Sequence, residues 1–364
     1  MPWGLASDDG ASALRELLLG RAGVDTIVGL DNRAAMFPIH RGLRFLTIVA
    51  TPGVPASTIR ARFGVTTAAE LDALPAREDG TRETAYPIRL SPARLQWLGG
   101  RAGRWPDLRE RRDAELLESL LRRFPALGDE GGWAARFGRE LNVTEDRRHF
   151  GHVGLPVLEG KHVSAFAVSS DTRWRVTRER AAQLLPNRSF DRARVGYRDV
   201  SGVGNQRSLI AAVIPSGCVT THTIFCLRTE AEPAAHQFLC ALLNSFVLNF
   251  VARLLMGGHM TTSLVESLPA PRWTSSPEQR RLGLLAERLS RRPTARVAIA
   301  LETRVARLFG IDADDFRRIV STFPLISTDV RDKTIAAYSA EPRSRRRDAR
   351  RSAARPPASG DYRE

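Results

Sequence analysis

Cysteine is scarce in this chain of 364 residues, with Cys218, Cys226 and Cys240 as its only representatives. Their number is odd, and no two of them form a Cys-x-x-Cys pair. This argues against a disulfide framework and against a structural zinc site, so we expect a reducing compartment.

The chain also lacks a long uninterrupted apolar run. The longest, around residues 238–256, contains Asn244, Ser245, Asn249 and Arg253. No basic segment followed by an apolar one opens the sequence, which argues against a signal peptide. We therefore expect a soluble, cytoplasmic protein with no membrane partner.

Acidic residues and lysine are both under-represented. Only 40 residues are Asp or Glu against 55 that are Lys or Arg, and Lys161 and Lys333 are the only lysines. The net charge of +15 suits a polyanionic partner, although solvated arginines that merely keep the protein in solution would give the same balance. With 43% hydrophobic residues, the chain is long enough for two or more domains.

Recognisable catalytic motifs are missing as well. Gly202 and Gly204 do not begin a dinucleotide-binding loop, because Arg207 occupies the third glycine position and a strand follows. No Gly-x-Ser-x-Gly motif or paired Cys and His context indicates a nucleophile. His149 and His152 near Glu145 could begin a metal site, but without further ligands ordinary loop histidines are favoured. The acidic stretches 7–9 and 312–315 are expected to be helix caps.

Hydrophobic periodicity predicts a helix at 11–22 and strands at 24–30 and 44–50. Residues 45–50 are almost all apolar, as in a strand covered on both faces, and the early sequence supplies no layer to cover them. Residues 52–92 resemble a linker with one short helix near 68–74, and a charged helix is expected at 106–124.

The pattern then changes to short strands separated by turn residues. Strands are expected at 155–161, 162–168, 193–199, 208–215 and 221–227. One long helix is predicted from Pro233 to about Leu255, followed by helices at 277–291, 295–309 and 312–321. The arginine-rich end from residue 341 is too charged to fold alone.

The stretch from Val195 to Gly217, VGYRDVSGVGNQRSLIAAVIPSG, combines two strand-like runs with a strongly polar centre. A buried hairpin usually keeps its polar residues on one face and closes with a two-residue turn. Here donors and acceptors concentrate at the tip, which predicts that something outside the chain is recognised there.

Several stretches together resemble large adenine-N6 DNA methyltransferases of restriction-modification systems. The end of their methyltransferase domain resembles residues 14–51, in particular Asp31-Asn32-Arg33 and Phe37-Pro38-Ile39-His40-Arg41. Their Taq-methyltransferase-type target-recognition domain resembles four further stretches. These are LPVLEGK at 155–161, the residues from Tyr197 to Pro215, Leu242-Leu243-Asn244-Ser245 and Leu268-Pro269-Ala270-Pro271.

The resemblance implies an α+β fold. Residues 1–55 would be the C-terminal remnant of a doubly wound, Rossmann-like methyltransferase sheet, and 56–135 a linker and helical segment. Residues 136–275 would form a mixed target-recognition domain, 276–335 C-terminal helices, and 336–364 a disordered basic tail. The implied partner is double-stranded DNA in a restriction-modification or phage-defence system.

The sequence departs from the family where catalysis is concerned. It contains neither the Asn-Pro-Pro-Tyr/Phe motif that binds the flipped adenine nor the glycine-bearing loop that binds S-adenosylmethionine. We therefore expect no cofactor in this chain and no methyl transfer by it alone. A methyltransferase half, upstream in cis or separate in trans, would supply S-adenosylmethionine binding, as in a truncated, differently started or split enzyme.

The tip of the 195–217 hairpin has residue types that read base edges, arginine for guanine and asparagine or glutamine for adenine. The candidate DNA-binding residues there are Arg198, Asn205, Gln206, Arg207 and Ser208. Lys161, Arg175 and Arg178 are candidates for phosphate contacts. Asn244 and Ser245 are expected to form a buried hydrogen-bonded clasp instead. A non-catalytic DNA-binding remnant and a protein-interaction subunit are the alternative functions.

Overall fold

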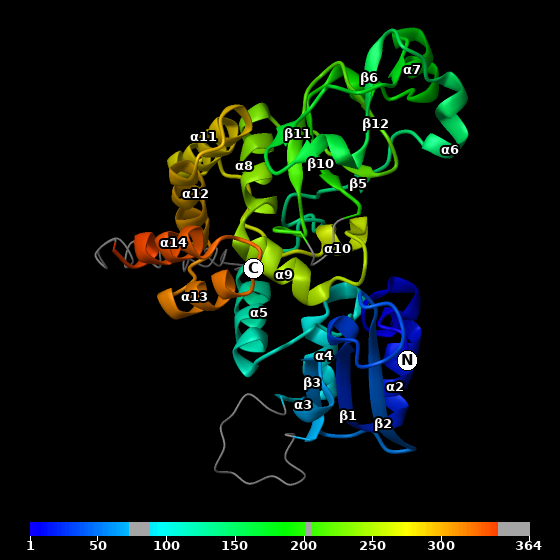
Figure 1. The fold of residues 1–364 in the computed structure, drawn as a ribbon, viewed down its shortest axis with the longest axis vertical. Helices are drawn as coiled ribbons and strands as arrows, with labels where there is room; N and C mark the ends of the chain where they lie inside the picture. The colour runs from blue at the N-terminus through cyan, green and yellow to red at the C-terminus, as the bar shows by residue number, and fades with distance from the viewer. Residues whose placement is uncertain (73–87, 201–204, 341–364) are drawn as a thin grey trace, which may run out of the picture.

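The computed structural model describes residues 1–72, 88–200 and 205–340. The fold is α+β, as expected, with several small mixed sheets and many helices. Figure 1 shows strands β1 to β4 at one end of the molecule and the strands after residue 137 toward the other. The helices after residue 277 lie along one flank.

The first sheet has the strand order β2-β1-β3-β4. Its strands are β1 (Ala22–Asp31), β2 (Arg44–Pro52), β3 (Ile59–Val65) and β4 (Ile88–Leu90). β1 pairs antiparallel with β2 and parallel with β3. The linker interpretation is therefore wrong for residues 59–65, where every second residue is buried. That alternation is the normal signal of a strand with one buried face.

Strand β2 is not covered on both faces, in agreement with the expectation that the early sequence supplies no layer to cover residues 45–50. Leu46 is buried, but Val49, on the opposite face, is 55% exposed. β2 is also an edge strand, apart from a short contact with the first residues. There the amino terminus donates a hydrogen bond to Leu46 O (2.7 Å) and Trp3 N donates to Arg44 O (3.2 Å). The short α1 (Gly4–Ser7) and η1 (Asp9–Ala11) follow this contact.

Helices α2 (Ser12–Arg21), α3 (Ala68–Asp72) and α5 (Arg111–Arg123) confirm the expected ones. α5 begins later than predicted because the carboxylate of Asp113 accepts hydrogen bonds from the backbone N–H groups of Arg109 and Glu110. These bonds cap the helix and fix its first turn. α4 (Pro92–Leu98), which was not predicted, packs against α2 and α5.

The strands from 137 to 227 form three small sheets. One has the order β11-β10-β13-β5, another β12-β6-β9, and β7 and β8 form a hairpin. Their bounds are β5 (Phe137–Gly138), β6 (Leu155–Leu158), β7 (Val163–Ser164), β8 (Ala167–Val168), β9 (Arg175–Val176), β10 (Arg194–Arg198), β11 (Ala211–Ile214), β12 (Val219–Thr220) and β13 (Ile224–Leu227). The single strand expected at 162–168 instead turns back at Phe166, which has a φ of 70°. Short helices α6 (Val143–Asp146) and α7 (Arg178–Leu184) complete this region.

The long helix expected from Pro233 is two helices, α8 (Pro233–Leu243) and α9 (Phe246–Leu255), at an angle of 61°. The chain breaks here because Ser245 Oγ accepts a hydrogen bond from Leu248 N and so begins a new helix. In the described parts of the chain, no single helix is long and apolar enough to cross a membrane; α8 and α9 meet that test only as a bent pair.

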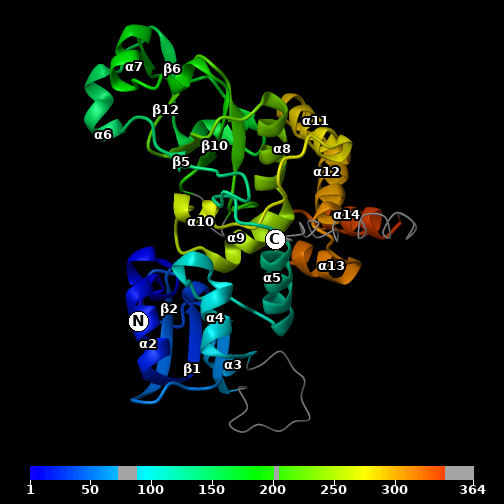
Figure 2. The ribbon, with the colours of Figure 1, turned by 180° about the vertical axis from the view of Figure 1, so that it is seen from behind.

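The helices expected at 277–291, 295–309 and 312–321 are present, with two additions (Figure 2). The expected helices are α11 (Pro277–Arg291), α12 (Ala295–Leu308) and α13 (Ala313–Ser321), and the additions are α10 (Thr262–Glu266) and α14 (Thr328–Ala340). α14 was missed, and it enters the region expected to be tail because Tyr338 is buried and its hydroxyl donates to Ile311 O. Residues 341–364 lie outside the described residues.

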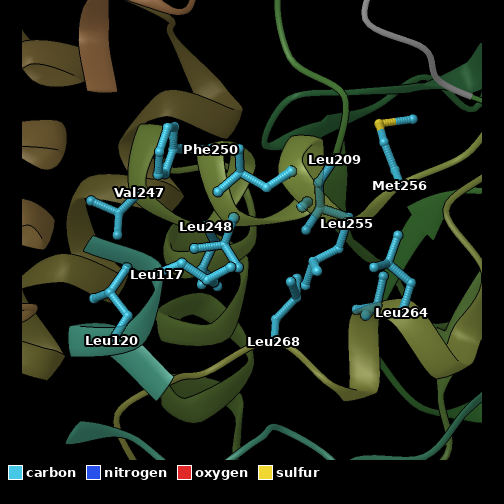
Figure 3. Packing of buried hydrophobic residues seen from close by; sticks show 14 of the residues in the cluster. Leu117, Leu120, Leu209, Val247, Leu248, Phe250, Leu255, Met256, Leu264 and Leu268 are labelled. Atoms are coloured by element: carbon cyan, nitrogen blue, oxygen red, sulfur yellow. The ribbon is translucent and has the colours of Figure 1, made fainter. Parts of the chain in front are cut away.

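One hydrophobic cluster extends from Trp3 to Tyr338. In Figure 3, Val247 and Leu248 of α9 lie beside Leu117 and Leu120 of α5. Leu209, Leu264 and Leu268 join the same cluster. Because it includes residues on both sides of positions 55, 135 and 275, the proposed domain boundaries remain a prediction.

Candidate nucleic-acid interface

The hairpin predicted at 195–217 is present. β10 and β11 pair antiparallel, with Arg194 opposite Ile214 and Tyr197 opposite Ala211. Residues 201–204, the centre of the expected recognition tip, lie outside the described residues. The described part of this loop therefore consists of 199–200 and 205–210, and we refer to residues 198–200 and 205–206 as the hairpin end.

The segment that returns from the hairpin end is held by α9. Asn249 Oδ1 accepts hydrogen bonds from Ser208 N (2.9 Å) and Leu209 N (2.8 Å). Its amide nitrogen donates to Leu209 O at 3.2 Å. The fully buried Asn249 thus supplies the hydrogen-bond donor and acceptor that a neighbouring strand would otherwise provide to this backbone.

The expected clasp at the α8–α9 break is confirmed. Asn244 Nδ2 donates to Ala211 O (2.8 Å), and Asn244 Oδ1 accepts from Ala211 N (3.1 Å). Ser245 is also fully buried and caps α9. Both residues therefore position the hairpin from behind and do not reach the surface.

Arg207, one of the expected base-reading residues, points into the protein. Its Nη2 donates to Glu302 Oε1 (2.8 Å) and its Nε to Asn244 O (2.7 Å). The guanidinium carbon lies 5.0 Å from the centre of the Phe246 ring, and the side chain is only 14% exposed. In this placement Arg207 connects the hairpin to α9 and α12, and the expectation that it contacts a base does not hold.

Ser208 is likewise misplaced by sequence reasoning. It is fully buried, and its hydroxyl accepts a hydrogen bond from Arg253 Nε at 2.9 Å. Arg253 also donates to the carbonyl oxygens of Asn205 (2.9 Å) and Gln206 (3.2 Å). Ser208 therefore belongs to the support of the hairpin end.

The remaining candidates on the hairpin lie at its end. Gln206 is exposed and Asn205 is half-buried. Arg198 is also half-buried, and its Nε is enclosed without a hydrogen-bond partner in the described structure. Asn205 and Gln206 are held through their carbonyl groups. The backbone that carries these side chains is therefore fixed, as recognition by side-chain amides requires.

The three candidates for phosphate contacts come from segments outside the hairpin. Lys161 is 70% exposed and pairs with Glu159 at 2.5 Å. Arg178, on the first turn of α7, pairs with Asp191. Arg175, in β9, donates to Gly154 O at 3.1 Å and has no carboxylate partner among the described residues. Two of the three cations are thus partly neutralised.

Sequence reasoning missed two basic side chains beside the hairpin end. Arg139 and His259 both approach the buried carboxylate of Asp199, at 3.7 Å and 3.4 Å, and both are more than half exposed. Asp199 is fixed through its backbone, because its N–H donates to Thr223 O and its carbonyl accepts from Met260 N. No local motif marks this group, since Arg139 and His259 are 120 residues apart in the sequence.

Arg139 also lines a cavity of about 500 Å³. Its lining includes Arg139, Arg192, Arg194 and Arg228 from the strands and the loops that flank them, together with His236 of α8. Arg194 is neutralised by Glu140 in a buried pair at 2.6 Å. Burial lowers the pKa of His236, so this imidazole favours its neutral form.

No catalytic centre emerges from the described residues. No group of three or more His, Cys, Asp or Glu side chains there is arranged to hold a metal ion. The three cysteines are buried, and burial raises the pKa of Cys226 to about 12, which keeps the thiol protonated and unreactive.

The acidic stretches have different roles. Asp312 caps α13 as predicted, since its Oδ1 accepts from Asp315 N at 2.8 Å. Asp8 makes no capping bond, and Asp9 pairs with Arg104, so the cap interpretation is wrong for these two.

No family model and no curated protein matches the chain. Solved structures to which it is similar include the type IIG restriction endonuclease BpuSI, at 11% identity and a TM-score of 0.38 over 92% of this chain and 46% of BpuSI. Another is the type IIL restriction-modification enzyme MmeI in complex with DNA, at 10% identity and a TM-score of 0.41 over 96% of this chain and 47% of MmeI. The chain thus spans about half the length of these proteins. Similarity at this level transfers neither residues nor activities.

Proposed function

We propose that this chain recognises the DNA sequence for a site-specific adenine-N6 DNA methyltransferase of a restriction-modification system. The observation that supports this most is that stretches resembling a target-recognition domain, far apart in the sequence, pack against one another. Leu158 shares a buried cluster with Ile210 and Ala212. Asn244 binds Ala211, and Leu268 packs in the same core as Leu209.

The groups at the hairpin end suit recognition of duplex DNA. The side-chain amides of Asn205 and Gln206 can both donate and accept, as adenine edges require, and Arg139 and His259 lie beside the same loop. The backbone behind them is held by Asn249 and Arg253. Rigid support of this kind favours discrimination between bases, whereas mobile cations provide mainly affinity.

We assign methyl transfer to residues outside this chain. Enzymes that modify a base must first rotate it out of the stack into a pocket, and the adenine-pocket motif of the family is absent from the sequence. The glycine-bearing loop for S-adenosylmethionine is absent too. A methyltransferase part, in cis or in trans, would bind the cofactor and the flipped adenine.

A second candidate function, a protein-interaction subunit, is supported by exposed apolar side chains near β2. Phe37, Ile39, Leu43 and Val49 are each 40% or more exposed, and they come from β2 and the connection that precedes it. Exposed apolar side chains gathered in one region are typical of protein interfaces. In the first candidate function this surface would contact the methyltransferase part, and in the second it would be the main functional surface.

Direct binding separates the two functions. Fluorescence anisotropy of the full chain with labelled duplex DNA should show saturable binding whose affinity falls linearly with the logarithm of salt concentration. Single-stranded DNA and a protein of similar negative charge serve as controls. Absence of duplex binding at about 50 mM salt would reject the DNA-recognition proposal and favour the protein-interaction subunit.

A further inference from the structure

A tryptophan surrounded by cations lies at the end of the recognition region, away from the hairpin end. The guanidinium carbons of Arg147 and Arg173 lie 4.9 Å and 4.8 Å from the ring centre of Trp174. The His152 ring stacks on the same indole, with centres 6.2 Å apart and planes at 17°. We call Arg147, His152, Arg173 and Trp174 the Trp174 cluster.

The backbone beneath the Trp174 cluster is fixed. Trp174 O accepts a hydrogen bond from Val157 N at 2.9 Å. Arg175 and Gly151 exchange two backbone hydrogen bonds, at 2.8 Å and 3.0 Å. Gly154 packs closely against the next residues of the same segment, because it has a φ of 109° and a Cβ there would lie 2.3 Å from Val176 O. The cluster is therefore a built feature of two crossing segments and not a chance meeting of loops.

The arginines of this surface are not neutralised. Arg147, Arg148, Arg173 and Arg175 form no ion pair with any described carboxylate, and Arg147, Arg148 and Arg173 are exposed. Their neighbours in the sequence differ, because Arg178 and Arg188 both pair with Asp191 and Arg192 pairs with Glu230. The surface thus presents four arginines that lie outside ion-pair distance of the described carboxylates, with Asp146 and Asp171 close to them in the sequence.

Stacking gives these arginines a property that ordinary surface arginines lack. A guanidinium that lies against an aromatic ring loses part of its side-chain freedom before any ligand binds, while its N–H groups stay available. Binding an anion then costs less conformational entropy than ordering a free arginine would. Planar donors in this arrangement match the oxygens of a phosphate group.

We propose that the Trp174 cluster, with Arg148 and Arg175 beside it, binds the phosphate backbone of duplex DNA. This inference rests on the proposed function and adds a second contact surface to the hairpin end. It assigns affinity without base preference to the cluster, because phosphate contacts position a protein on DNA but carry no sequence information. Arg147 and Arg173, which were not among the residues expected from sequence, would make the main contacts.

The test compares two double variants of the full chain. Arg147→Ala/Arg173→Ala removes the stacked cations, and Arg281→Ala/Arg288→Ala removes two exposed arginines of α11 that also lack carboxylate partners in the described structure. α11 lies on the opposite flank from α6, beside which Arg147 lies (Figures 1 and 2). Each protein is titrated with the same duplexes at several salt concentrations.

The cluster variant should lower the slope of log affinity against log salt by about 1.8, since each phosphate contact contributes about 0.9. The cluster variant should bind all duplexes more weakly by the same factor. The α11 variant should have the same affinity and salt slope as the unaltered chain. A third variant, Arg173→Lys, retains the charge but not the stacked guanidinium. Its salt slope should lie between those of the cluster variant and the unaltered chain. Unchanged unfolding temperature and circular dichroism show that the variants are folded.

Equal slopes for the cluster variant and the unaltered chain would overturn the inference while leaving the proposed function intact. A change in base preference in the cluster variant would also contradict it. If the unaltered chain binds no duplex DNA, the proposed function itself has failed, so the two failures are distinguishable.

Discussion

At the scale of single residues, Arg207 illustrates why residue type alone misplaces a binding site. Arginine is the side chain that most often reads guanine, and Arg207 lies in the most polar stretch of the hairpin. Its partner Glu302 is 95 residues away, on a helix that sequence analysis placed in another domain. Asn244 was assigned correctly, because its apolar surroundings already indicated burial. Local sequence patterns could not show which residues distant in the sequence would be the partners of Arg207.

Arg207→Ala should lower stability and leave base preference unchanged. The substitution leaves the buried Glu302 carboxylate without its cation, which typically costs about 3–5 kcal/mol. Denaturation by urea, with the exposed Arg281→Ala as a control, measures this cost. A decrease of less than about 1 kcal/mol in the free energy of unfolding would show that the Arg207–Glu302 ion pair contributes little to stability.

The stability lost in Arg207→Ala should increase as the pH rises. Burial raises the pKa of the Glu302 carboxyl, and Arg207 opposes that rise. A carboxyl whose pKa is higher in the folded than in the unfolded chain stabilises at low pH, and this contribution is lost as the pH rises through its folded pKa. Without Arg207 the pKa rises further, so the variant should lose more stability than the unaltered chain as the pH rises above the ordinary range of a carboxyl group. In Arg207→Ala/Glu302→Gln the extra pH dependence should disappear.

At the scale of elements, the break between α8 and α9 organises the candidate site. The sequence predicted one long helix because Asn244, Ser245 and Asn249 interrupt an otherwise helical apolar pattern without a glycine or proline. In the structure Asn244 and Asn249 bind the backbone of residues 208–211, and Ser245 caps α9. A polar residue in an apolar helix signals such a buried contact but does not show which strand it serves.

Arg253→Ala should loosen the hairpin end without unfolding the chain. Arg253 donates to the carbonyl groups of Asn205 and Gln206 and to the Ser208 hydroxyl. We expect faster amide hydrogen exchange at residues 205–210 and unchanged protection in α11. If α11 loses protection to the same extent, Arg253 stabilises the whole chain and has no particular role at the hairpin end.

Gln206→Ala should change the sequence preference of DNA binding. A well-placed amide contact discriminates between bases by about 1–3 kcal/mol, so preference at one base pair should relax. Gln183→Ala, another exposed glutamine, on α7, is the matched control. Identical selected motifs for Gln206→Ala and the control would exclude this side chain from base recognition.

At the scale of the whole molecule, strand and helix positions were largely predictable, and the way they assemble was not. The helix at 277–291 was correct to the residue because cap, apolar stripe and proline coincide there. β3 was read as linker because Arg60 and Arg62 alternate with its apolar residues, and neighbouring proline and threonine obscured the pattern. Which strands pair, and which helices cover them, depends on contacts between segments that single-sequence patterns do not contain.

The full chain should transfer no methyl group by itself. Neither the adenine-pocket motif nor the cofactor loop of adenine-N6 DNA methyltransferases is present in the sequence. Incubation with labelled S-adenosylmethionine and duplex DNA should leave the DNA unlabelled, with an active adenine methyltransferase as the positive control. Label on adenine would show that this chain holds a catalytic site of another kind.

Binding-site selection from random duplexes tests the central claim most directly. The full chain is incubated with a pool of random sequences at moderate salt, and bound molecules are amplified and sequenced over several rounds. The proposed function predicts enrichment of one short motif that is unchanged in Arg147→Ala/Arg173→Ala and altered in Gln206→Ala. Binding that persists through all rounds with no enriched motif would show that the chain binds DNA without reading its sequence, and would contradict the claim.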